Sequence, residues 1–214
     1  MADLHTENIR QAPSHRICEH ARGILGDIKA TSYQHQTQVS AKDGIYRVDC
    51  SGLVDYILEQ VAPTHYRQIP YQRHGRPLAR DFYAFFTSLP THDRAEIGGW
   101  CRVEKLAQAR RGDILAYKYT PQVRQIKGTT GHVLIIFSRP QKLQNGEYVV
   151  LVVDSARSAH GDDTRREGQM MGVGRGKMWF GTDTDDRPVY YRWSGPAAPR
   201  NESNIEGIAI ARAL

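Results

Sequence analysis

The residues around Cys50 place a thiol at the start of a predicted helix. The segment 46–61 reads YRVDCSGLVDYILEQV. Its apolar residues recur at the spacing of a buried helical face: Leu53, Val54, Ile57, Leu58 and Val61. Asp49 or Ser51 can cap this helix, and Gly52 leaves space for a substrate to approach the sulfur. The pattern favours Cys50 as a nucleophile over the alternative of a core cysteine.

A thiol in this position is expected to ionise readily. Unpaired backbone N–H groups and the helix dipole at a helix N-terminus favour a thiolate over a thiol. With a cationic neighbour, such placement can bring a thiol pKa from about 8.5 to roughly 3.5–7.5. The alternative interpretation is a buried cysteine without chemistry, because free cysteines are among the most buried residues.

A cysteine nucleophile needs a base within hydrogen-bond reach and a third group that orients the base. Among the nine histidines, His132 is best placed, because it begins the apolar strand GHVLIIF after the flexible segment KGTTG. The next predicted strand, 148–153, ends at Asp154, and Asn145-Gly146 between the strands indicates a hairpin. Antiparallel pairing would make His132 and Asp154 neighbours, so that the carboxylate could hold the imidazole in one tautomer. The alternatives are a strand-capping histidine and a solvated carboxylate.

The elements that position these residues are predicted from hydrophobic periodicity. Helical spacing predicts helices over residues 17–28, 53–61 and 79–89. Runs of β-branched and aromatic residues predict strands at 114–117, 133–137, 148–153, 178–180, 189–193 and 205–211. Helices first and an antiparallel sheet second are typical of an α+β domain. We predict a single domain over 1–214, with a core at 17–156 and a strand-rich C-terminal extension at 157–214.

Composition limits the classes of partner. The net charge of +6 favours association with anionic surfaces, but no motif for a specific nucleic-acid site is present. No apolar run reaches the ~18 residues of a membrane span, so we expect no membrane span. The N-terminal segment lacks the apolar region of a secretory signal. We therefore expect a cytoplasmic protein by default, or a periplasmic or secreted one if it is trimmed or exported by another route.

The cysteines and two polar segments give weaker signals. Cys18, Cys50 and Cys101 form no CxxC pair, so no zinc ribbon is indicated, and a bridge between Cys18 and Cys101 stays open. HGDD at 160–163 is interpreted as a solvated loop rather than a metal site. GVGRG at 172–176 is interpreted as a turn between strands rather than a phosphate loop. We expect neither a metal nor a cofactor.

Three segments resemble the signature segments of the NlpC-type cysteine peptidases, papain-like enzymes of bacterial cell-wall peptide metabolism. They are DCSGLV at 49–54, GDILAY at 112–117 and GHVLIIF at 131–137. The resemblance spans roughly residues 30–156. It implies a papain-like α+β fold with Cys50 as nucleophile, His132 as base and Asp154 as the third polar group.

The resemblance also implies a substrate- or oxyanion-binding tyrosine upstream of the cysteine. Tyr33 is the nearest match, and Tyr46 is the alternative because the Trp-Gly-Gly that usually follows this tyrosine is missing after Tyr33. From the signature segments themselves, Asp49, Ser51 and Gly131 are further candidates for this part of the site.

The function implied is hydrolysis of an amide in peptidoglycan stem peptides, commonly the bond between D-glutamate and a diamino acid. Two alternatives remain: transfer of an acyl group to another acceptor by the same triad, and a non-catalytic module that binds cell-wall peptides. A small basic amidase without a signal could also be an interbacterial toxin, which would have an immunity or inhibitor protein as its partner.

Overall fold

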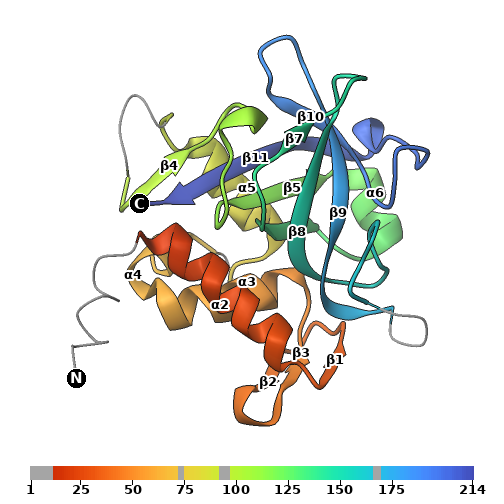
Figure 1. Cartoon of the computed structure of the whole chain (residues 1–214). Helices are drawn as coiled ribbons and strands as arrows, with labels where there is room; N and C mark the ends of the chain where they lie inside the picture. Colours follow the sequence, from red (N-terminus) through yellow and green to blue (C-terminus); the bar gives the residue numbers. More distant parts are fainter. Residues whose placement is uncertain (1–11, 72–74, 92–96, 166–169) are drawn as a thin grey trace, which may run out of the picture.

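A curled antiparallel sheet with helices packed on one of its faces forms the centre of a mixed α+β fold (Figure 1). The computed structural model describes residues 12–71, 75–91, 97–165 and 170–214. The α-helices are α2 (Pro13–Asp27), α3 (Cys50–Val61), α4 (Pro63–Tyr66), α5 (Ala79–Ser88) and α6 (Pro121–Lys127). The 3₁₀ turns are Ala41–Asp43, Leu106–Gln108 and Glu202–Asn204.

Two sheets contain the strands. The small sheet has the order β1 (Ala30–Ser32), β3 (Ile45–Arg47) and β2 (Gln38–Ser40). The large sheet has the order β10-β9-β8-β6-β5-β11-β4, with β7 paired to β8. Its strands are β4 (Trp100–Arg102), β5 (Ile114–Tyr119), β6 (Gly131–Ile136), β7 (Gln141–Lys142), β8 (Tyr148–Ala156), β9 (Gly172–Thr182), β10 (Pro188–Arg192) and β11 (Ile205–Ala213). All of its pairs are antiparallel, which confirms the predicted α+β class.

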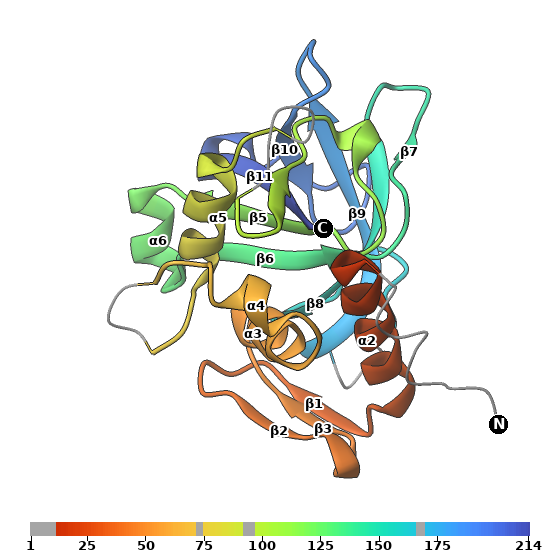
Figure 2. The ribbon, with the colours of Figure 1, turned by 90° about the vertical axis from the view of Figure 1, so that its left-hand side faces the viewer.

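Alternation along the strands produces two hydrophobic cores. On β5, Ile114 and Ala116 face the helices, whereas Leu115 and Tyr117 face the inside of the curl. The apolar side of α3 packs in the first core, against β6 and β8 (Figure 2). Strands β10 and β11 also approach each other across the curl, so its inside is filled by apolar and aromatic side chains.

Two long-range hydrogen bonds fix the segment before α3 against the large sheet. The Ser155 hydroxyl on β8 donates to the Val48 carbonyl at 2.6 Å. The Val173 backbone N–H on β9 donates to the Thr31 hydroxyl at 2.8 Å. The first turn of α3 is therefore held at the end of β8 where Asp154 lies.

The predicted pairing of the two central strands is confirmed, but the predicted turn between them is wrong. Ile135 of β6 pairs with Val153 of β8 in an antiparallel register. The Asn145-Gly146 turn instead joins β8 to the short strand β7, which the sequence pattern did not predict. The chain after β6 adds this short strand before it turns back.

The glycine-rich segment 172–176 is the first half of β9, so its interpretation as a turn is wrong. A Cβ at Gly174 would lie 2.6 Å from the Arg165 side chain, and a Cβ at Gly176 would lie 2.6 Å from Asp163. These glycines leave room for the segment that crosses over the strand. Among the described residues, no helix has the length and apolar character needed to cross a membrane.

Candidate functional site

Cys50 is the first residue of α3 and is 3% exposed. The helix is capped by Asp49, whose carboxylate accepts from the Gly52 N–H at 2.7 Å, so Asp49 and not Ser51 is the cap. The Cys50 side chain lies close enough to His132 to raise the pKa of the imidazole. The helix start and the strand start predicted from the sequence are therefore adjacent in the fold.

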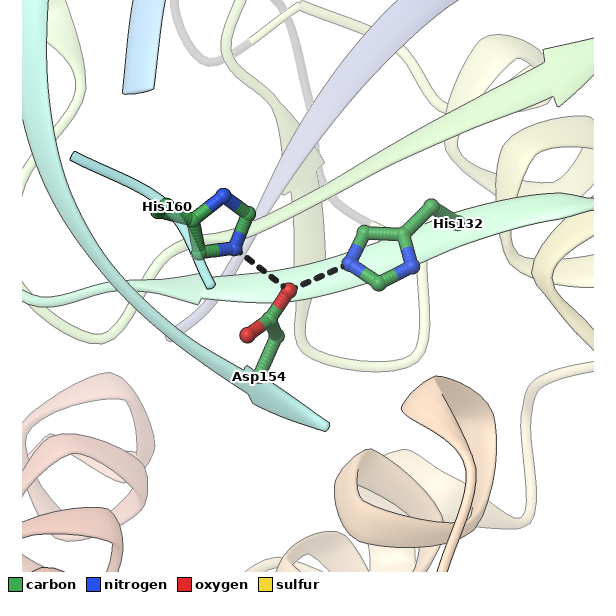
Figure 3. A group of neighbouring side chains, drawn as sticks. All are labelled: His132, Asp154 and His160. Carbon is green, nitrogen blue, oxygen red and sulfur yellow. Dashed lines mark hydrogen bonds and ion pairs between the residues drawn. The ribbon is translucent and has the colours of Figure 1, made fainter. Parts of the chain in front are cut away.

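His132 and Asp154 form the next contact. The His132 Nε2 atom lies 2.5 Å from Asp154 Oδ2 (Figure 3). Continuing the β6–β8 register by one step from Ile135↔Val153 places Asp154 opposite position 134. His132 lies two residues from that position on the same face of the sheet, so the two side chains are diagonal neighbours.

Asp154 is shared by a second imidazole and a guanidinium. His160 Nε2 lies 2.8 Å from the same Oδ2 atom, and Figure 3 shows both imidazoles directed at this oxygen. The other carboxylate oxygen accepts from Arg165, whose side chain is 1% exposed. The carboxylate is therefore held on both oxygens and cannot turn away from His132.

Burial and charge set the ionisation of this group. Burial alone would raise the pKa of Asp154, but the charges of His160 and Arg165 and the imidazole hydrogen bonds hold it well below the usual range. Burial would lower the pKa of His132, but the Cys50 thiolate and the bond to Asp154 outweigh it and raise this pKa to about 9. The arrangement favours a protonated His132 at neutral pH.

The pH dependence of His132 provides a direct test of its interaction with Cys50. We expect NMR titration of the His132 ring to give a pKa of about 9 in the wild type and a lower pKa in Cys50→Ala, which lacks the thiolate. Because the folded-state pKa exceeds the ordinary value of 6.5, this interaction stabilises the fold fully below pH 6.5 and is lost as pH rises through about 9. The same pKa in both proteins would contradict this interaction.

A cleft of about 410 Å³ opens beside His132. Its walls are largely aromatic and polar, with one aliphatic residue from α6 at position 126. The residues that line it are Tyr33, Tyr119, Ile126, Lys127, Thr129, Gly131, His132, Ala156, Arg157, Ser158, Tyr191, Trp193 and Asn201. A reacting group bound in this cleft would contact the imidazole directly.

The structure distinguishes the two candidate tyrosines. Tyr33 lines the cleft, and burial together with the charges of Cys50 and Asp49 raises its pKa. Tyr46 is 3% exposed in the helix-side core, with its ring against Tyr56. Tyr33 directly follows β1, and β3 ends two residues before Asp49. Because β1 pairs in parallel with β3, the residues that follow the two strands, Tyr33 and Cys50, are brought together.

The three remaining candidates also differ in whether they line the cleft. Gly131 lines the cleft, and a Cβ there would lie 2.0 Å from the Tyr117 carbonyl, so only glycine fits at its φ of +155°. Asp49 and Ser51 do not line the cleft. Both accept hydrogen bonds from Arg76, at 2.9 and 2.7 Å, and thus support the start of α3.

Sequence reasoning missed His160 and Arg165. The interpretation of 160–163 as a solvated loop is wrong for His160, which is 5% exposed, and for Asp163, whose side chain is 2% exposed, and it holds for Asp162, whose side chain is 74% exposed. The segment folds back over β9 because Gly174 and Gly176 leave room for it. The alternating glycines that follow a polar cluster were the available signal.

Aromatic rings cover the two imidazoles. Trp193 lies against His160 with ring centroids 4.0 Å apart and against His132 at 5.4 Å. The indole N–H donates to the Ala159 carbonyl at 2.9 Å, which fixes the ring. Low polarity above the carboxylate strengthens the hydrogen bonds beneath it.

The three residues of Figure 3 are also a candidate metal-binding group. The ligand atoms of His132, Asp154 and His160 lie within 4.8 Å of one another. Arg165 binds the same carboxylate and places a positive charge against any divalent cation. The direct bonds to Asp154 fit hydrogen bonding better than metal ligation.

The arrangement can ionise a thiol, protonate a leaving group and orient the proton carrier. Comparison of the chain with protein-family models, with curated proteins and with solved structures gave no match. The assignment of function therefore depends on the residues and their geometry.

Proposed function

We propose that the protein is a cysteine hydrolase with a papain-like arrangement of its site. Cys50 is the nucleophile, His132 the general acid and base, and Asp154 the residue that orients His132. The observation that carries this proposal is that Cys50, at a helix N-terminus, raises the pKa of His132, whose ring bonds the buried Asp154 and lines a cleft. A thiol, a base and an orienting carboxylate in this order are the components of nucleophilic catalysis.

The proposed substrate is an amide in peptidoglycan stem peptides. Support comes from the resemblance of the segments 49–54, 112–117 and 131–137 to the NlpC-type signatures, two of which contribute Cys50 and His132. The cleft volume of about 410 Å³ suits a short peptide segment.

In the proposed reaction the Cys50 sulfur attacks the amide carbonyl and forms a tetrahedral intermediate. The Cys50 backbone N–H stabilises its oxyanion, and Tyr33, which stays protonated because its pKa is raised, is the second donor. The His132 imidazolium gives its proton to the leaving amine as the C–N bond breaks. Water, deprotonated by neutral His132, then releases the acyl group and restores the thiolate.

A non-catalytic binding module fits the site less well. Such a module has no need of a carboxylate buried to 0% exposure and held by two imidazoles and an arginine. Burying these charges costs free energy, which a purely structural role could avoid with apolar residues.

Mass spectrometry of peptidoglycan fragments tests the proposal. We expect new stem-peptide termini with the wild type and none with Cys50→Ala, because the alanine lacks the attacking sulfur. Cys18→Ala is the matched control, since Cys18 is also a buried free cysteine but lies on α2 outside the site. Cleavage by Cys50→Ala would contradict the proposal, and transfer of the acyl group to an added amine would identify an acyltransferase.

A further inference from the structure

Besides His132, the cleft carries two side-chain cations, and no acidic residue is among those that line it. The cations are Arg157, which follows β8, and Lys127, the last residue of α6. A cleft lined by one sign of charge raises the local concentration of ligands with the opposite charge.

Arg157 is held over an aromatic face and keeps donors for a ligand. Its guanidinium carbon lies 5.1 Å from the centroid of the Tyr33 ring, and Nη2 lies 3.4 Å from His35 Nε2. In the described part of the chain, no carboxylate lies within ion-pair distance of this guanidinium. A guanidinium with five N–H donors retains several for a bound carboxylate.

Lys127 also lies over an aromatic ring that lines the cleft. Its Nζ atom lies 5.0 Å from the centroid of the Tyr119 ring. It too forms no ion pair with a described carboxylate, whereas Lys118, on the same strand as Tyr119, is paired with Glu206 at 2.7 Å. The ammonium group is thus available to a ligand in the cleft.

The elements associated with the two cations lie on opposite sides of β6. In the sheet order, β6 with His132 lies between β8 and β5 (Figure 2). Arg157 extends from the end of β8, and Lys127 lies over Tyr119 on β5. A peptide whose reacting carbonyl is at Cys50 and His132 would therefore have one cation on each side.

We propose that the cleft selects substrates with a negative group on each side of the carbonyl that Cys50 attacks, one bound by Arg157 and the other by Lys127. The substrate class is an acidic peptide with free carboxylates, and the amidated form of the same peptide is disfavoured. This inference rests on the proposed role of Cys50 as nucleophile. A charge-assisted hydrogen bond is worth enough to make each cation contribute about tenfold in selectivity.

Alkylation of Cys50 by a charged and a neutral reagent tests the inference without a known substrate. With iodoacetate or iodoacetamide the sulfur forms a bond to the methylene carbon and iodide leaves. The readout is the ratio of the two second-order rate constants, measured for the full chain at low salt. We expect Arg157→Gln and Lys127→Gln each to lower the iodoacetate rate by about threefold to tenfold. The iodoacetamide rate reports any change in thiol reactivity that both reagents share, so the ratio isolates the effect of the reagent's charge.

Matched controls remove a cation from an aromatic ring elsewhere. Arg22 lies 5.3 Å from the Phe137 ring and Lys142 lies 5.4 Å from the Tyr148 ring, both outside the cleft. Arg22→Gln and Lys142→Gln should leave the ratio at the wild-type value. His132 contributes equally in all these proteins, so differences between them report on the substituted cation.

The outcomes separate this inference from the proposed function. If the ratio falls in both cleft variants but no stem peptide is cleaved, the charge selection stands and the peptidoglycan substrate is wrong. If stem peptides are cleaved, the free-acid form should exceed its amidated form in kcat/KM, and this preference should fall in both variants. A ratio that neither cleft variant changes, or that the control variants change equally, overturns the inference.

Discussion

Replacing Asp154 with asparagine is expected to lower kcat of the proposed hydrolysis by about 10³–10⁴-fold. Asp154 accepts from His132 and His160 on one oxygen and from Arg165 on the other. A carboxamide has only one oxygen and carries no charge, so it cannot satisfy all three donors or stabilise the imidazolium. His132 would lose both its orientation and the charge that supports its protonated form. The measurement is steady-state turnover of a stem-peptide fragment.

Asp154→Asn also removes the negative charge that balances the buried Arg165, so a control is needed that separates loss of stability from loss of catalysis. Asp163 is 2% exposed at its side chain and binds the same Arg165 at 2.7 Å, but it does not contact His132. Asp163→Asn should therefore reduce the free energy of unfolding while it preserves most of kcat. Equal losses of kcat in the two variants would show that Asp154 acts only by holding the loop. Wild-type kcat in folded Asp154→Asn would contradict its orienting role.

The parts of the site that sequence could predict are those set by local pattern. The apolar spacing after Cys50 specifies the buried face of α3 whatever lies against it, and Asp49 caps the helix through a bond to Gly52 three residues on. The pairing that joins His132 to Asp154 follows from two strong strand patterns close together in sequence. These features are determined by residues close together in sequence and depend little on the rest of the chain.

The parts that sequence did not predict depend on contacts between distant segments. Tyr33 lies beside Cys50 because β1 pairs with β3, and the three-residue strands that do this give almost no periodic signal. His160 and Arg165 are polar residues in a loop, and their burial depends on the glycines of β9 rather than on their own pattern. No residue near Cys50 in sequence indicates that the cation that supports its helix is Arg76.

Arg76 is expected to have the largest effect on stability among the residues around α3. It donates to both carboxylate oxygens of Asp49 at 2.9 Å, to Asp55 at 3.0 Å and to the Ser51 hydroxyl at 2.7 Å. The side chains of Asp49 and Asp55 are each 6% exposed. Arg76→Met would leave the buried carboxylate of Asp49 without its cation, so we expect a loss of roughly 3–5 kcal/mol in the free energy of unfolding. Urea denaturation at pH 7 measures it.

Two further variants separate this cause from a general effect of losing an arginine. Arg67 is exposed, and its side chain donates to Thr64 at 3.4 Å, so Arg67→Met should change stability by less than about 0.5 kcal/mol.

Burial raises the pKa of Asp55 from 3.8 to about 8. Protonated Asp55 therefore stabilises the fold at low pH, and this contribution is lost as pH rises through about 8.

At pH 6 the Asp55 carboxyl is already protonated by that shift, so Asp55→Asn should cost little there. Asp49 is then the carboxylate that most needs Arg76, and it precedes the proposed nucleophile directly. Arg76→Met should accordingly slow the alkylation of Cys50 as well as destabilise the fold, because the cap that positions the thiol is weakened. If Arg76→Met is as stable as Arg67→Met, the start of α3 is held by its packing on the sheet and not by this cation.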